Sequence, residues 1–126
     1  MTSTTTKKIL LVEDDSILRE TYQHFFEKSG YIVYLASSGP DAVSFSENEA
    51  FDIILLDIII PGFDGFHVLS KLKENPKTAH IPVVMMTNLD DDKFLQRAMK
   101  LGATEYLIKA TTTPQTTVAH VKEIIG

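Results

Sequence analysis

The sequence contains no cysteine among its 126 residues, which excludes a disulfide framework and a thiolate metal site. This absence fits a reducing compartment. The first apolar run covers only residues 9–12, which is too short for a signal peptide or a membrane span. Basic residues are outnumbered, and the net charge of -5 disfavours a nucleic-acid-binding face. These absences predict a cytoplasmic protein with no membrane segment and no nucleic-acid partner within this chain.

The length and the composition suit one globular domain. Hydrophobic residues make up 44% of the chain and charged residues 23%, an ordinary balance for a globular protein. A chain of 126 residues is long enough for one hydrophobic core and leaves no room for a second domain. The first residues are polar and rich in threonine. We therefore predict a disordered tail over residues 1–6 and one domain over residues 7–126.

Five short apolar runs alternate with segments of helical length. The runs are rich in Ile, Val, Leu and Tyr, and most are continuous, which is typical of strands buried on both faces of a parallel sheet. They cover residues 9–12, 31–36, 53–56, 81–86 and 106–108. Each run is therefore predicted to be a strand.

The segments between the runs carry helix signals. Leu18, Tyr22 and Phe26 are spaced by about one helical turn each. Asp64 is placed as the N-cap of a later helix, and Pro114 fits the first turn of the last one. Two more helices are predicted, one over residues 41–49 and one that has the acidic residues 90–92 at its start. Strand and helix alternate five times, which predicts an α/β fold with helices on both sides of a parallel sheet.

Chemically active side chains follow the predicted strands. In open parallel sheets the functional site lies at the carboxyl ends of the strands, so side chains placed there are expected to converge. They are Glu13, Asp14 and Asp15 after the first strand, Asp57 after the third, Thr87 after the fourth and Lys109 after the fifth.

These residue types together indicate phosphoryl transfer. Carboxylates held close together repel one another and need a cation, and oxygen ligands with room for water and phosphate suit Mg²⁺. A lysine and a hydroxyl beside such an ion position a phosphoryl group and neutralise its charge. Asp57 is then a candidate nucleophile. Asp15, the third acidic residue, is interpreted as the N-cap of the first helix rather than as a ligand.

The strand ends also form sequence motifs. Residues 9–15 read ILLVEDD, residues 52–65 read DIILLDIIIPGFDG, residues 80–87 read HIPVVMMT, and residues 102–109 read GATEYLIK. Together they resemble the response-regulator receiver domain of two-component signalling, as in chemotaxis receivers, from about residue 7 to residue 125. The resemblance implies a (βα)5 flavodoxin-like, doubly wound parallel sheet of five strands in the order 2-1-3-4-5.

The resemblance implies a phospho-acceptor and a metal site. Asp57 would accept a phosphoryl group from the phosphohistidine of a sensor histidine kinase or a histidine phosphotransfer protein. Asp14 and Asp57 would bind Mg²⁺ directly, with Mn²⁺ as an alternative ion. Glu13 would hold the ion through water, and Ile59 would supply its backbone carbonyl. The domain would be a signalling module and not an enzyme, although it assists its own phosphorylation and dephosphorylation.

The resemblance also implies a switch. Lys109 and Thr87 would contact phosphoryl oxygens, and Thr87 and Tyr106 would move on phosphorylation. Their movement would change the surface of residues 90–126, which would signal to a downstream protein. Pairing of two copies through the last helices on phosphorylation stays open. The sequence does not identify the kinase, the output pathway or the oligomeric state.

The chain departs from the family pattern near the predicted site. Ala110 follows Lys109 where proline is usual, so a looser or differently routed loop is expected. Asn88 follows Thr87 where a small residue is usual, and it is expected to crowd the phosphate or to form a hydrogen bond near it. Ile59 and Leu89 stand at positions that are often polar. We hypothesise that they shield the acyl phosphate from water and slow its loss.

Three other classes are alternatives. A flavodoxin-like flavin carrier needs hydroxyl and N–H groups after the first strand, where this chain has acidic residues that repel phosphate. A hydrolase with an aspartyl-phosphate nucleophile typically carries a second Asp two residues after the first, where this chain has Ile59. A phosphorylation-independent pseudo-receiver that only binds partners is disfavoured by the complete set of strand-end residues, and it is the main alternative.

Overall fold

The computed structural model describes residues 6–126, which form a five-stranded parallel sheet in the order β2-β1-β3-β4-β5. The predicted doubly wound fold and its strand order are therefore confirmed. The predicted tail lies outside the described residues except for Thr6, which belongs to no helix or strand. The strands are β1 (Lys8–Val12), β2 (Ile32–Ala36), β3 (Ile53–Leu56), β4 (Val83–Thr87) and β5 (Glu105–Ile108).

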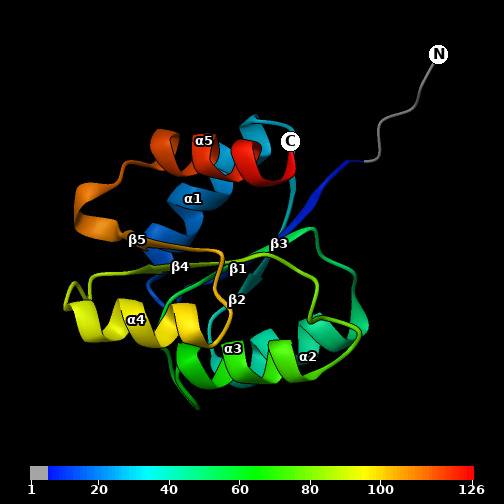
Figure 1. Cartoon of the computed structure of the whole chain (residues 1–126). Coiled ribbons are helices and arrows are strands. Elements are labelled where there is room, and N and C mark those ends of the chain that lie inside the picture. Colours follow the sequence, from blue (N-terminus) through cyan, green and yellow to red (C-terminus); the bar gives the residue numbers. More distant parts are fainter. Residues whose placement is uncertain (1–5) are drawn as a thin grey trace.

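Five α-helices cover the sheet in two layers. They are α1 (Ser16–Lys28), α2 (Gly39–Asn48), α3 (Gly65–Glu74), α4 (Asp92–Lys100) and α5 (Pro114–Ile125), and a 3-10 turn, η1, spans Lys109–Thr111. Figure 1 shows α1 and α5 on one face and α2, α3 and α4 on the other. Among the described residues, no helix is both long and apolar enough to cross a membrane.

The central strands face two hydrophobic cores at once. Along β1, Ile9 and Leu11 pack with the layer of α1 and α5, while Leu10 and Val12 pack with the layer of α2, α3 and α4. This alternation explains the continuous apolar runs, because successive side chains point to opposite faces. The prediction of strands buried on both faces holds for β1, β3 and β4. It is wrong for the edge strands β2 and β5, which are largely half-buried.

Polar side chains start the helices where the sequence signals place them. Asp15 accepts hydrogen bonds from the N–H groups of Ile17 and Leu18, which confirms its role as the N-cap of α1. Asp64 caps α3, and Pro114 lies in the first turn of α5, as predicted. The second helix begins at Gly39 instead of residue 41, because Ser38 is its N-cap and a proline occupies its first turn.

The strand register brings the ends of four strands to one edge of the sheet. Val12 pairs with Leu56, Leu56 with Met85, and Thr87 with Ile108. The next residues along the chain therefore gather at that edge, although they are up to 96 positions apart. This edge carries the candidate functional site.

Candidate functional site

An open cleft of about 470 Å³ lies at the carboxyl edge of the sheet. The loops after β1, β3, β4 and β5 line it. The structure brings all six side chains predicted to converge at the strand ends to this cleft, and Ile59, predicted to contribute its backbone carbonyl, lines it as well. Tyr106, a predicted switch residue, is not among the lining residues. The lining residues are Glu13, Asp14, Asp15, Leu18, Asp57, Ile59, Thr87, Asn88, Leu89 and Lys109.

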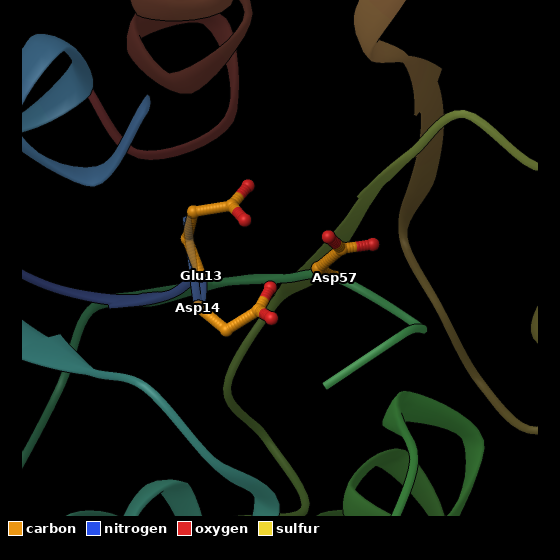
Figure 2. A group of neighbouring side chains, drawn as sticks. All are labelled: Glu13, Asp14 and Asp57. Atoms are coloured by element: carbon orange, nitrogen blue, oxygen red, sulfur yellow. The ribbon is translucent and has the colours of Figure 1, made fainter. Parts of the chain in front are cut away.

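Three of the carboxylates that line the cleft form a cluster. Glu13, Asp14 and Asp57 each place an oxygen within 4.8 Å of the others, and Figure 2 shows them beside one another at the ends of β1 and β3. Glu13 and Asp57 are buried, whereas Asp14 is exposed. Like charges at this separation favour a bound cation, and an all-oxygen donor set with an open side fits Mg²⁺.

Lys109 pairs with both buried carboxylates. Its Nζ donates to Glu13 Oε1 at 2.8 Å and to Asp57 Oδ2 at 2.7 Å. Burial lowers the pKa of the Lys109 ammonium, but the hydrogen bonds and charges of Asp57 and Glu13 outweigh it, so the pKa lies above its ordinary value. Lys109 is thus held as a cation between the two carboxylates.

Burial also acts on the Glu13 carboxyl. It raises the pKa of Glu13 above the ordinary value, while hydrogen bonds from the Lys109 ammonium and the Asp15 N–H oppose the shift. Asp15 lies outside the carboxylate cluster because its own side chain caps α1. The acidic run of three therefore contributes two carboxylates to the cluster, as its N-cap interpretation requires.

Asp57 is fixed by the turn that follows it. Its Oδ1 accepts the Ile58 N–H at 2.7 Å, and its own N–H donates to Val12 O at 3.1 Å. Gly65 packs directly behind this backbone, since a Cβ on Gly65 would lie 2.3 Å from Asp57 O. Only glycine allows such a close approach. The start of α3 therefore sets the position of Asp57.

Thr87 and Tyr106 both contact the backbone of Leu89. Thr87 Oγ1 accepts the Leu89 N–H at 3.3 Å, and the Tyr106 hydroxyl donates to Leu89 O at 2.6 Å. Burial raises the pKa of the Tyr106 hydroxyl, with the charges of Asp57 and Asp90 adding to the shift, so it stays a donor. The two predicted switch residues are thus joined through one loop residue.

The loop after β5 was expected to be looser or differently routed, and it forms a turn that is hydrogen-bonded to the loop after β4. Lys109–Thr111 form a 3-10 turn, and the Ala110 N–H donates to Asn88 Oδ1 at 2.8 Å. Asn88 was expected to crowd the phosphate or to form a hydrogen bond near it, and its oxygen is used to hold the neighbouring loop. The two departures from the family pattern therefore meet in one contact, which sequence reasoning missed. The sequence feature that could have indicated this contact is the position of Asn88 and Ala110 just after two adjacent strands.

The strand order and the strand-end side chains agree with one protein family. The family model described as response regulator receiver domain matches residues 9–122. The chain belongs to this family. Membership favours the receiver interpretation over the flavin carrier and the aspartyl-phosphate hydrolase.

The receiver is similar to part of longer regulators. It is 34% identical over 119 residues to the alkaline phosphatase synthesis transcriptional regulatory protein PhoP of Bacillus subtilis, an alignment that covers 94% of this chain and 48% of PhoP. The chain spans about half the length of such curated relatives. Activities and partners of the longer proteins are therefore properties of those proteins.

Solved structures share the fold of this receiver. The chemotaxis response regulator CheY4 of Vibrio cholerae superposes with a TM-score of 0.89 at 26% identity, covering 95% of this chain and 99% of CheY4. The BeF3-activated N-terminal receiver domain of RstA from Klebsiella pneumoniae gives a TM-score of 0.87 at 29% identity, covering 94% and 98%. Both matches extend over nearly the whole chain.

Proposed function

We propose that this receiver accepts a phosphoryl group on Asp57 from the phosphohistidine of a sensor histidine kinase or a histidine phosphotransfer protein. One observation carries the proposal. The Asp57 carboxylate is fixed at a strand end, within 4.8 Å of oxygens from Glu13 and Asp14 and hydrogen-bonded to the Lys109 ammonium. Anionic and cationic groups are thus placed on either side of one candidate nucleophile.

The transfer itself is a displacement at phosphorus. An Asp57 carboxylate oxygen forms a P–O bond while the P–N bond to the donor imidazole breaks, and the electron pair returns to the imidazole nitrogen. Asp14, Asp57 and the Ile59 carbonyl, with Glu13 through water, would hold Mg²⁺, and this ion would supply charge neutralisation for the phosphoryl oxygens. Mn²⁺ has the same preference for carboxylate and carbonyl oxygen and is an alternative ion.

Lys109 supplies the second positive charge. In the unmodified protein it pairs with Glu13 and Asp57. An acyl phosphate on Asp57 carries its negative charge on the phosphoryl oxygens. The Lys109 ammonium then moves a short distance to pair with these oxygens. The same residue therefore compensates charge before and after transfer.

The switch starts at Thr87. Its hydroxyl accepts the Leu89 N–H, and Tyr106 holds the carbonyl of the same residue. A Thr87 side chain that rotates to donate to a phosphoryl oxygen moves its hydroxyl oxygen away from the Leu89 N–H, so the loop and Tyr106 rearrange together. This changes the surface of α4, β5 and α5, and a downstream protein that binds one arrangement better reads the signal.

Intact mass spectrometry tests the acceptor chemistry. The protein is incubated with Mg²⁺ and acetyl phosphate beside an Asp57→Asn control and a sample with excess EDTA. A labile phosphate adduct is expected on the wild-type protein with Mg²⁺, and neither control should form it. A wild-type protein that stays folded but forms no adduct, and also fails to bind beryllofluoride, would favour the phosphorylation-independent pseudo-receiver.

A further inference from the structure

One hydrogen bond joins the loops after β4 and β5. The Ala110 N–H donates to Asn88 Oδ1 at 2.8 Å, and the two residues are 22 positions apart in the chain. Thr87 pairs with Ile108 in the sheet, so Asn88 and Lys109 both follow directly on the ends of adjacent strands. The bond therefore joins the residue that follows the predicted switch threonine to the residue that follows the site lysine.

Apart from the ion pairs of the Lys109 side chain, the turn that carries this residue makes few other hydrogen bonds to the described residues. It is a 3-10 turn of three residues without a side-chain cap, and both Ala110 and Thr111 are exposed. Two further hydrogen bonds of this turn are longer, at 3.3 Å, and both stay within residues 108–112. The Asn88 contact is short and ties the turn to a different strand end.

The position of this turn sets the point from which the Lys109 side chain leaves the backbone. The Lys109 side chain leaves the first residue of the turn and ends between Glu13 and Asp57 at 2.8 and 2.7 Å. A long, flexible side chain contacts two partners at once only when its backbone is in the right position. A displaced backbone requires other rotamers, and each of these loses one of the two contacts. Fixing Ala110 fixes the backbone next to Lys109.

We propose that Asn88 is a positioning residue for Lys109, acting through the Ala110 N–H; its effect on phosphorylation rests on the proposed function of Asp57. The same contact couples the loop that follows Thr87 to the loop that carries the lysine. The contact requires both residues. Proline in place of Ala110 has no N–H to donate, and alanine in place of Asn88 has no side-chain oxygen to accept it.

A double-mutant cycle tests this coupling. The variants are Asn88→Ala, Ala110→Pro and both together, and Thr111→Ala is the matched control because it removes only a longer bond within the same turn. Three quantities are measured: amide hydrogen exchange at residue 110, acetylation of Lys109 by a mild reagent, and the rate of adduct formation with Mg²⁺ and acetyl phosphate. Thermal unfolding verifies that each variant is folded.

In the otherwise wild-type protein, Asn88→Ala should speed amide exchange at Ala110 and acetylation of Lys109, and should slow adduct formation by roughly 2- to 10-fold, the range for one lost hydrogen bond. Thr111→Ala should leave Lys109 acetylation and adduct formation near wild-type values. When Ala110→Pro is already present, adding Asn88→Ala should have no further effect on acetylation or adduct formation, because the partner N–H is already gone.

The outcomes separate this proposal from the proposed function. Unchanged exchange and acetylation in Asn88→Ala would overturn the positioning role, whether or not Asp57 takes phosphate. Faster acetylation with an unchanged rate of adduct formation would overturn the proposed effect of this positioning on phosphorylation. A wild-type protein that forms no adduct refutes the proposed function, and the exchange and acetylation data then decide on the positioning of Lys109 alone.

Discussion

At the scale of single residues, the Lys109 ammonium is the centre of the ion pairs of the site. It donates to Glu13 and Asp57, the two buried carboxylates, while Asp14 stays exposed at the mouth of the cleft. Burying like charges without a partner is unfavourable, so a cation beside them is required. The acidic run and the lysine predicted this need from the sequence. Which carboxylates the lysine contacts follows from side-chain packing.

Ile59 and Leu89 are expected to control how long the phosphate stays on Asp57. Both line the cleft, and Ile59 is 63% exposed, so its substitution disturbs little packing. Apolar side chains over an acyl phosphate limit the approach of water. We predict that Ile59→Asn and Leu89→Glu each shorten the lifetime of the phosphorylated protein several-fold. Loss of the adduct after removal of the donor, followed by intact mass, measures this.

The exposed residue Ile17 provides the control for that experiment. It is 74% exposed and lies outside the cleft lining. Ile17→Asn removes a similar amount of apolar surface without opening the site, so its lifetime should match the wild-type value. Equal lifetimes for all four proteins would refute shielding by Ile59 and Leu89.

At the scale of elements, the turn from β3 into α3 places the acceptor. Gly65 N–H donates to Ile58 O at 2.8 Å, and a Cβ on Gly65 would meet backbone atoms of Asp57 and Ile58 at 2.3 and 2.7 Å. Backbone cannot yield as a flexible side chain does. The glycine therefore allows α3 to start directly behind Asp57, the proposed phospho-acceptor.

We predict that Gly65→Ala lowers the free energy of unfolding by about 2 kcal/mol or more, because backbone must shift to make room for the methyl group. The displaced Asp57 should also slow adduct formation. Urea unfolding and intact mass with acetyl phosphate measure the two effects.

Gly30→Ala is the matched control for the Gly65→Ala variant. Gly30 has a positive φ of 97° but nothing within 4 Å of an added Cβ, so only backbone strain of about 1 kcal/mol is expected, with unchanged adduct formation. Wild-type adduct formation in Gly65→Ala would contradict the placement of Asp57 by this turn.

Helix starts were the elements that the sequence predicted best. Asp15, Asp64 and Pro114 take the predicted places, because a cap contacts N–H groups only two or three residues ahead. The start of α2 lies at Gly39, before the predicted residue 41, because Ser38 is its N-cap. The contact between Asn88 and Ala110 has no such local signal, because it joins residues on different strands.

At the scale of the whole molecule, the strand order gives strands of similar composition different degrees of burial. Ile9–Val12 of β1 and the residues of β2 are both apolar runs, yet β1 lies between β2 and β3 while β2 is an edge. Leu10 is completely buried between the two layers, and Ile32 is 42% exposed. Composition alone does not distinguish these environments.

We predict that Leu10→Ala lowers the free energy of unfolding by about 2–5 kcal/mol, because it leaves a cavity in the core beneath α2 and α3. Ile32→Ala, which removes similar atoms at the sheet edge, should lower it by about 1 kcal/mol or less. Urea unfolding followed by circular dichroism measures both. Equal losses for the two variants would contradict the central position of β1.

The sequence by itself determined the alternation of strands and helices, the caps, and the set of side chains that follow the strands. These depend on periodicity and on contacts within a few residues, which a linear sequence contains. The tertiary structure decided that the edge strands β2 and β5 are only half-buried, that Lys109 pairs with Glu13 and Asp57 while Asp14 stays exposed, and that Asn88 contacts the turn that carries Lys109. Each of these features depends on chain segments brought together only by strand register and packing, so no local pattern records it.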